Sequence, residues 1–228
     1  MKPKIFVSID FDGTITDSDI TDEILKAFAK PEWEEIERQW EQGIIGSREC
    51  LSLQFSLVDS PIERLLEYVD CFSPNKSFFP FIDFLRENQI PFAIISDGFD
   101  IFIKRILLNA GIKGVPLFAN KIENNGNGLK TIFPYSGKDC SFGICKCSVA
   151  KKLSNGYKIF HIGDGRSDFC LSEKVTYTFS KGKLTHYCRK NNLPHSSFKD
   201  FSDIEAVLEK YLKNSFDLGK AGFISILQ

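Results

Sequence analysis

The sequence of 228 residues lacks any apolar run close to the roughly 20 residues that a membrane-spanning helix needs. Its net charge is only −1, and its lysines and arginines form no run, so neither nucleic acid nor an anionic membrane is an expected partner. Internal repeats and low-complexity segments are also lacking. We therefore expect a globular protein, long enough for one domain and an inserted module.

A cleavable signal peptide is not expected, because the first residues lead directly into a predicted core strand. The seven cysteines are odd in number and scattered, which favours reduced thiols and a cytoplasmic location. Cys140, Cys145 and Cys147 lie close in sequence, but the absence of a C-x-x-C pair and of a fourth ligand argues against zinc. The oligomeric state stays open between monomer and homodimer.

Strand patterns alternate with helix patterns in most of the chain. Apolar runs at residues 5–9, 90–96 and 157–162 are typical of buried strands. Helical spacing at residues 79–88 and 100–110 lies before and after the second of these strands. This alternation predicts an α/β fold: a Rossmann-like parallel sheet with helices on both faces. Smaller expected elements are strand pieces at 117–120 and 176–179, a β-hairpin around 124–128, and helices around Val149 and at 204–212.

The segment between the first two strands is different, because it carries only helical patterns. These patterns lie at residues 19–30, 31–40, 47–57 and 60–68. We therefore predict an all-helical cap domain at residues 18–74, inserted into a core domain of residues 1–17 and 75–228.

Two aspartates, Asp10 and Asp12, follow the first predicted strand. Because side chains alternate along a strand, both carboxylates lie on one side of its end, where they repel each other unless a cation lies between them. Mg²⁺, which binds carboxylates, waters and a substrate phosphate, meets that need. Gly13 lets the backbone turn sharply there. The alternative is a solvated turn, since Asp-Gly is a common turn pair.

The other two main strands also end in polar, glycine-containing loops. Ser96, Asp97 and Gly98 follow the second strand, and Asp164 and Asp168 follow the third. In open α/β sheets ligands bind outside the carboxyl ends of the strands, so the three loops together predict a metal-and-phosphate site. Lysines that could hold the phosphate precede the third strand, namely Lys146, Lys151 and Lys152.

These motifs resemble those of the haloacid dehalogenase superfamily of phosphatases. Residues 10–16 are similar to its first motif, Ser96 to its second, Lys146 to its third and residues 163–168 to its fourth. The resemblance implies that Asp10 is the nucleophile, which takes the phosphoryl group as an aspartyl-phosphate. It implies further that Asp12 is the general acid and then the base.

The same resemblance implies the ligands of the site. Mg²⁺ would be held by Asp10, the backbone carbonyl of Asp12 and Asp164, with Asp168 steadying the ligands. Ser96 and a lysine, with Lys146 in the position of the motif, would hold the phosphate oxygens. Gly98 offers a backbone N–H group to the same oxygens, and Asp97 either contacts the ligand or only forms the turn.

The helical insertion resembles the cap of the phosphoserine-phosphatase-like branch. Within that branch the stretches 31–36, 47–49, 96–100 and 187–198 are similar to the methionine-salvage phosphatase family. Arg48 is a predicted substrate ligand, with a surface ion pair to Glu49 or Glu41 as the alternative. Asp19 either meets a substrate amine or caps the following helix.

Three functions are compatible with these patterns. The first is a Mg²⁺-dependent phosphomonoesterase for a small metabolite, such as 2-hydroxy-3-keto-5-methylthiopentenyl-1-phosphate in methionine salvage. The second is a phosphatase of phosphoserine or a phospho-amino-alcohol. The third is a non-catalytic phosphate-binding protein, which the acidic residues argue against, because a pure binder has no need of a costly acidic cluster.

Overall fold

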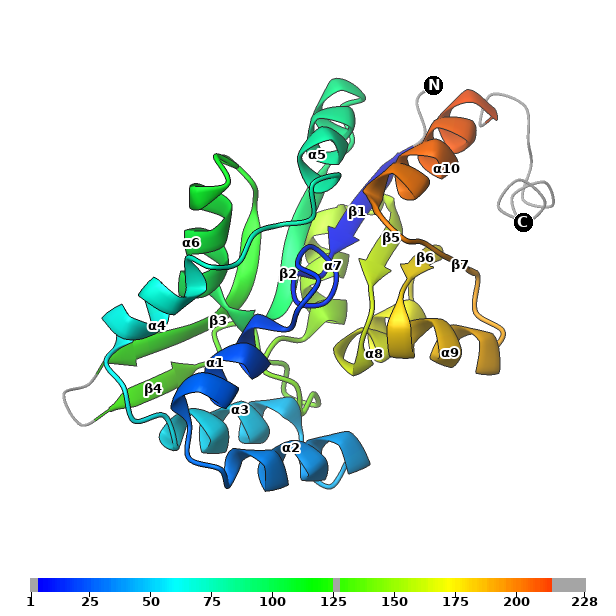
Figure 1. Ribbon diagram of the computed structural model, residues 1–228. Coiled ribbons are helices and arrows are strands. Elements are labelled where there is room, and N and C mark those ends of the chain that lie inside the picture. Colours follow the sequence, from blue (N-terminus) through cyan, green and yellow to red (C-terminus); the bar gives the residue numbers. More distant parts are fainter. Residues whose placement is uncertain (1–3, 125–127, 215–228) are drawn as a thin grey trace.

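A seven-stranded sheet forms the centre of the computed structural model, which describes residues 4–124 and 128–214 (Figure 1). The strand order is β4-β3-β2-β1-β5-β6-β7. The central strand β1 (Ile5–Ile9) is entirely buried and pairs in parallel with β2 (Phe92–Phe99) and with β5 (Lys158–Gly163). Its uninterrupted apolar character agrees with this position, because both faces of a central parallel strand are covered.

The outer strands extend this parallel sheet on both sides. β3 (Leu117–Asn124) is parallel to β2, and β4 (Leu129–Ile132) returns antiparallel to it, which confirms the predicted small hairpin. Most of the hairpin turn, residues 125–127, lies outside the described residues. β6 (Tyr177–Ser180) and β7 (His195–Ser197) follow on the other side.

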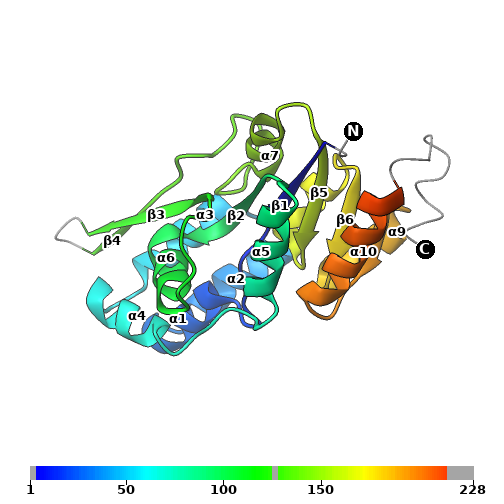
Figure 2. The ribbon, with the colours of Figure 1, turned by 90° about the horizontal axis from the view of Figure 1, so that it is seen from above.

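Helices cover both faces of the sheet, as predicted (Figure 2). One face carries α5 (Phe78–Glu87), α6 (Asp100–Asn109) and α10 (Phe201–Asn214), whose buried aromatic residues join one large apolar cluster. The opposite face carries α7 (Lys146–Ser154) and α8 (Phe169–Ser172), which bury a smaller apolar cluster around Ile144 and Leu171. The sheet is therefore packed between two layers of buried apolar side chains.

The remaining helix of the sheet domain, α9 (Gly182–Lys190), packs against β7, and a short 3₁₀ turn at Arg166–Asp168 precedes α8. The sequence patterns predicted neither α9 nor β7. α9 begins at a glycine and is largely polar, and β7 has only three residues, none of them strongly apolar.

The insertion after β1 is helical, in agreement with the sequence patterns. It consists of α1 (Ile20–Phe28), α2 (Trp33–Gln42), α3 (Ser47–Ser56) and α4 (Ile62–Val69). Asp19 caps α1 by accepting a hydrogen bond from the Asp22 N–H at 3.0 Å. α3 packs against β4, where the hydroxyls of Ser52 and Thr131 lie 3.0 Å apart. Within the described ranges, no helix has the length and apolarity needed to cross a bilayer.

The aromatic cluster between α5 and α10 makes a stability prediction. Phe81→Ala should lower the free energy of unfolding by roughly 3–5 kcal/mol, because Phe81 is fully buried and packs against Phe84 and Phe201. Phe79 lies in the same helix but is 48% exposed, so the matched control Phe79→Ala should lower the free energy of unfolding by about 0.5 kcal/mol or less. Urea denaturation followed by circular dichroism measures both, and equal losses would contradict the assignment of this core.

Candidate active site

Three acidic side chains meet at the carboxyl ends of the central strands. Asp10 follows β1, Asp164 follows β5, and the register pairs Ile9 with Ile162, so the two strand ends lie side by side. One carboxylate oxygen from each of Asp10, Asp164 and Asp168 lies within 4.8 Å of the other two. The structure thus brings Asp10 together with Asp164 and Asp168, which lie far from it in the sequence.

Lys146, the first residue of α7, lies between two of these carboxylates. Its Nζ is 2.8 Å from Asp10 Oδ1, 2.6 Å from Asp168 Oδ1 and 3.0 Å from Ser167 Oγ, and the residue is only 3% exposed. Lys151 and Lys152, the other two lysines that the sequence left open, are exposed on the same helix. Lys146 is therefore the lysine that contacts the acidic cluster.

The three carboxyl groups differ in the direction in which their pKa values are shifted. Burial and then the charge of Asp168 raise the pKa of Asp10 well above its usual range and raise that of Asp164 to about 7. Burial alone would also raise the pKa of Asp168, but Lys146 and His161 outweigh it and lower the pKa. A single lysine leaves excess negative charge among three buried carboxyl groups, and such an all-oxygen donor set suits a hard divalent cation.

Asp168 is held in place from several sides. His161 Nε2 lies 3.0 Å from Asp168 Oδ1 without hydrogen-bond alignment, and His161 Nδ1 lies 3.3 Å from Ser8 Oγ. The backbone N–H of Asp164 donates to Asp168 Oδ2 at 3.2 Å. His161 is fully buried in β5, and it supports the acidic cluster from this strand.

Asp12 lies beside the three aspartates, but its carboxylate is not one of the grouped ligands. Its Oδ1 accepts a hydrogen bond from the Ile20 N–H at 2.9 Å, and its Oδ2 lies 3.5 Å from Ser96 Oγ. Burial, and then the charge of Asp19, raise the pKa of Asp12 to about 8. The Asp12 carboxyl group therefore holds a proton near neutral pH, as a general acid must.

Two glycines allow these carboxyl groups to pack closely. Gly13 has φ +68°, a conformation that L side chains rarely adopt, and a Cβ there would lie 2.4 Å from Asp164 Oδ2. A Cβ on Gly98 would lie 2.5 Å from Asp12 Oδ2. Both positions require glycine because a carboxylate occupies the space of the missing side chain.

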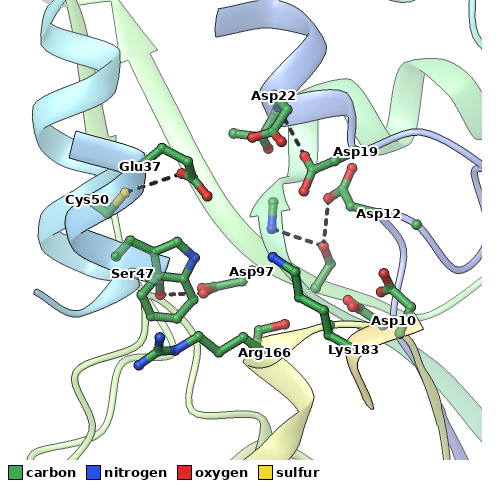
Figure 3. A pocket seen from close by; sticks show the side chains of 18 of the residues that line it. Asp10, Asp12, Asp19, Asp22, Glu37, Ser47, Cys50, Asp97, Arg166 and Lys183 are labelled. Carbon is green, nitrogen blue, oxygen red and sulfur yellow. Dashed lines mark hydrogen bonds between the residues drawn. The ribbon is translucent and has the colours of Figure 1, made fainter. Parts of the chain in front are cut away.

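A cavity of about 710 Å³ opens between the strand ends and the helices α1–α3 (Figure 3). From the strand ends it is lined by most of the predicted site residues, namely Asp10, Asp12, Ser96, Asp97, Gly98 and Asp164. From the helical side it is lined by residues such as Asp19, Asp22, Glu37, Trp40, Ser47 and Gln54, and at its rim by Arg166 and Lys183.

The cavity residues that the sequence analysis missed include four charged ones: Asp22, Glu37, Arg166 and Lys183. Asp22 carried a signal, because it follows Asp19 by three residues and so lies on the same side of α1. Arg166 lies inside the fourth motif, but an arginine at that position did not by itself indicate a role. Glu37 and Lys183 lie in helices with many similar charges, and nothing in the sequence singles them out.

Asp97 connects the strand end to the helical insertion. Its carboxylate accepts hydrogen bonds from the Ser47 hydroxyl, from the Ile144 N–H at 2.9 Å and from Asn120 Nδ2 at 3.1 Å. The Ser47 hydroxyl in turn accepts from the Gly143 N–H at 3.0 Å. Asp97 lines the cavity, but its carboxylate oxygens already accept hydrogen bonds from these protein groups. This agrees better with the structural alternative for Asp97 than with contact to a ligand.

Arg48 is not among the residues that line the cavity, so its predicted role as a substrate ligand stays a prediction. Its guanidinium donates a hydrogen bond to the Cys140 carbonyl, and its backbone N–H donates to the Ser141 carbonyl at 3.2 Å. The alternative ion pairs with Glu49 and Glu41 do not form among the described residues, and Glu41 pairs with Lys183 at 2.7 Å instead. The rotation of α3 directs Arg48 toward the loop before α7.

A parallel α/β sheet with an aspartate pair after β1, a helical insertion and an acidic cluster at the strand ends is the arrangement that the resemblance to the haloacid dehalogenase superfamily implies. Comparisons with known proteins agree. Residues 5–180 match the family described as Putative Phosphatase. The chain belongs to this family, and it is a phosphoric monoester hydrolase.

Two relatives carry the name 2-hydroxy-3-keto-5-methylthiopentenyl-1-phosphate phosphatase. The protein of Bacillus cereus is 32% identical, and that of Geobacillus kaustophilus is 30% identical; each alignment covers 92% of this chain and 98% of the relative.

Solved structures of phosphoserine phosphatases share the fold. One, described as a phospho-aspartyl intermediate analogue, has a TM-score of 0.69 and 20% identity over 90% of this chain and 98% of its own. A probable phosphoserine phosphatase from Vibrio cholerae has a TM-score of 0.71 and 19% identity over 96% of this chain and 68% of its own.

The position of Lys146 predicts a large effect on stability. Lys146→Met should lower the free energy of unfolding by roughly 3–5 kcal/mol, because it leaves Asp10 and Asp168 buried without their cation. Lys151→Met, a matched change on the exposed face of α7, should change it by about 0.5 kcal/mol or less. Urea denaturation with a chelator present compares the two. A Lys146→Met protein as stable as the control would refute the bridging role.

Proposed function

We propose that this chain is a Mg²⁺-dependent phosphomonoesterase for a small phosphorylated metabolite, and that 2-hydroxy-3-keto-5-methylthiopentenyl-1-phosphate is its first candidate substrate. The observation that carries this proposal is the placement of Asp10 at the tip of β1, facing the cavity and flanked by Asp12, Lys146 and Asp164. The substrate is suggested by the names of the relatives at 30–32% identity.

The reaction uses Asp10 and Asp12 in sequence. An oxygen of Asp10 attacks phosphorus and forms an aspartyl-phosphate, while Asp12 donates its proton to the leaving oxygen. Asp12 then takes a proton from the water that hydrolyses the aspartyl-phosphate. The Ser96 hydroxyl and the Lys146 ammonium bind the phosphate oxygens, and the Gly98 N–H supports Ser96 by donating to its Oγ at 3.0 Å. Phosphoryl transfer depends mainly on such positioning and on charge neutralisation.

The residues that would hold Mg²⁺ are Asp10, Asp164 and the backbone carbonyl of Asp12, with Asp168 orienting the loop of Asp164 through its backbone N–H. Bound there, Mg²⁺ would reduce the repulsion between Asp10 and the substrate phosphate.

Residues 18–74 act as the cap in this proposal, and residues 1–17 and 75–228 act as the core. The cap supplies the wall of the cavity opposite the strand ends. It is held by Ser47, which donates to Asp97, and by Arg166, which donates to the Glu41 carbonyl at 2.5 Å and lies over the Trp40 ring. Closure of this wall excludes water from the reacting groups.

The nucleophile proposal is tested with an aryl phosphate and Mg²⁺. Asp10→Asn should lower kcat by at least about 10³-fold, since an amide oxygen is a poor nucleophile. Asp17→Asn is the matched control, because Asp17 lines the same cavity but is exposed and lies outside the acidic cluster. Retention of turnover by Asp10→Asn would refute the mechanism, and so would activity that persists after Mg²⁺ is removed with a chelator.

A second candidate substrate class, a phospho-amino compound such as phosphoserine or a phospho-amino-alcohol, is favoured by the acidic cap wall. Asp19, Asp22 and Glu37 line the cavity together (Figure 3). Loss of hydration and then the charge of Asp22 raise the pKa of Asp19 to about 7, and loss of hydration and then Glu37 raise that of Asp22 to about 6. A substrate ammonium group would relieve this crowding of negative charge.

A substrate panel with one cap variant separates the two classes. If the substrate carries an ammonium group, Glu37→Gln should raise KM about tenfold with little change in kcat, because it removes a charged partner from the cavity wall. Glu34→Gln, an exposed position in the same helix, serves as the control. If 2-hydroxy-3-keto-5-methylthiopentenyl-1-phosphate is the best substrate and Glu37→Gln leaves its KM unchanged, the phospho-amino candidate is wrong.

A further inference from the structure

Two cysteines on the face of the sheet opposite α5 and α10 lie in contact. Cys147 is in the first turn of α7, Cys170 is in α8, and their Sγ atoms are 3.2 Å apart. Both residues are partly exposed, so small oxidants can reach them. Packing of two separate helices therefore places a pair of free thiols within easy reach of a disulfide bond, whose S–S length is about 2.05 Å.

Two further cysteines lie near this pair. Cys140 interacts first with Cys145 and more weakly with Cys170, and a Cβ on Gly137 would lie within 3.2 Å of both Cys140 Cβ and Cys145 Cβ. Among the described residues, no three cysteine sulfurs lie as close to one another as metal ligands do. The direct contact between sulfurs is that of Cys147 with Cys170.

A cation lies beside the two thiols. Lys174 Nζ is 3.2 Å from Cys170 Sγ, so a positive charge lies next to a sulfur that can react with a peroxide. Burial, and then the contact with Cys170, raise the pKa of the Cys147 thiol to about 12. The pair therefore consists of two sulfurs in contact with a neighbouring ammonium group.

Each cysteine is close in sequence to a residue of the acidic cluster. Cys147 directly follows Lys146, and Cys170 lies two residues after Asp168. Lys146 Nζ and Asp168 Oδ1 are themselves only 2.6 Å apart. A bond between the sulfurs therefore joins the same two segments that the buried ion pair joins.

We propose that Cys147 and Cys170 form a reversible redox pair, in which a peroxide oxidises the two thiols to a disulfide that links α7 to α8 and lowers turnover. One of the two thiols attacks a peroxide oxygen; the O–O bond breaks, a sulfenic acid forms on that sulfur, and the thiol proton leaves with the second oxygen as one water. The other thiol then attacks the sulfenic sulfur, the S–S bond forms, and a second water leaves. The two sulfurs together lose two electrons, which reduce hydrogen peroxide to two waters, and a dithiol reverses the change.

The disulfide lowers turnover because the sulfurs must approach each other by about 1 Å from their present contact. This movement shifts the start of α7 against α8 and displaces Lys146 relative to Asp168. Displacements of this size near reacting groups cost up to about 10²-fold in rate, so we expect roughly a tenfold loss of kcat. The effect on kcat rests on the proposed phosphatase function, whereas formation of the disulfide does not.

The full chain is treated with hydrogen peroxide, quenched by alkylation and measured by intact mass, by non-reducing peptide mapping and by hydrolysis of an aryl phosphate. The expected result is the loss of two hydrogen atoms, a crosslink between Cys147 and Cys170, and a kcat that falls about tenfold and recovers with dithiothreitol. Cys147→Ser and Cys170→Ser should abolish both the crosslink and the recoverable inhibition. The matched control Cys71→Ser, at an exposed cysteine, should change neither.

Lys174→Met gives a second test at an exposed position, which does not require a cysteine variant to fold. It should slow crosslinking several-fold while leaving reduced activity unchanged. Absence of a crosslink, a crosslink confined to Cys140 and Cys145, or a Cys147–Cys170 crosslink with unchanged kcat would each overturn the proposal. If the reduced wild-type protein hydrolyses no phosphate ester, the proposed function fails, and the crosslink map still decides whether the thiol pair exists.

Discussion

The contact of Lys146 with Asp10 and Asp168 is the interaction on which the rest of the site depends. All three side chains are nearly inaccessible to solvent, and an unpaired charge at such a depth would cost several kcal/mol. The contact forms only if β1, the loop after β5 and the start of α7 converge. The central position of β1, the parallel register with β5 and the packing of α7 across both strands produce this convergence.

This arrangement divides the acidic residues into two kinds. Asp168 is stabilised as a carboxylate by Lys146 and His161, whereas burial and neighbouring charges raise the pKa of Asp10 and Asp164. Lys146 contacts Asp10 but does not offset the negative charge of this pair, and a divalent cation would do so. Gly13 keeps the distance short by leaving room for the Asp164 carboxylate. Within one cluster, Asp168 thus supports the structure, and Asp10 and Asp164 are the residues that a cation would stabilise.

The cavity combines this cluster with a cap wall that is itself acidic. Asp19, Asp22 and Glu37 face the strand ends, while Arg166 and Lys183 contact Glu41 at the rim. In the proposed function, electrostatic selection of the substrate takes place at the cap, because the strand ends would bind the phosphate and the cation. Helices of the insertion share the main apolar core through residues such as Leu25 and Phe55, so this wall is firmly placed.

Period and composition are local properties of a segment, and they were enough to predict the parallel α/β sheet, the helical insertion and the residues at the strand ends. They could not choose among Lys146, Lys151 and Lys152, and they did not show that Arg48 lies outside the cavity lining, because each residue turns a helix by about 100° and only packing selects the inner face. Glu37 of the cavity and the Cys147–Cys170 contact were likewise decided by the tertiary structure alone. Their neighbours come from distant parts of the chain, and no local pattern encodes such a distance.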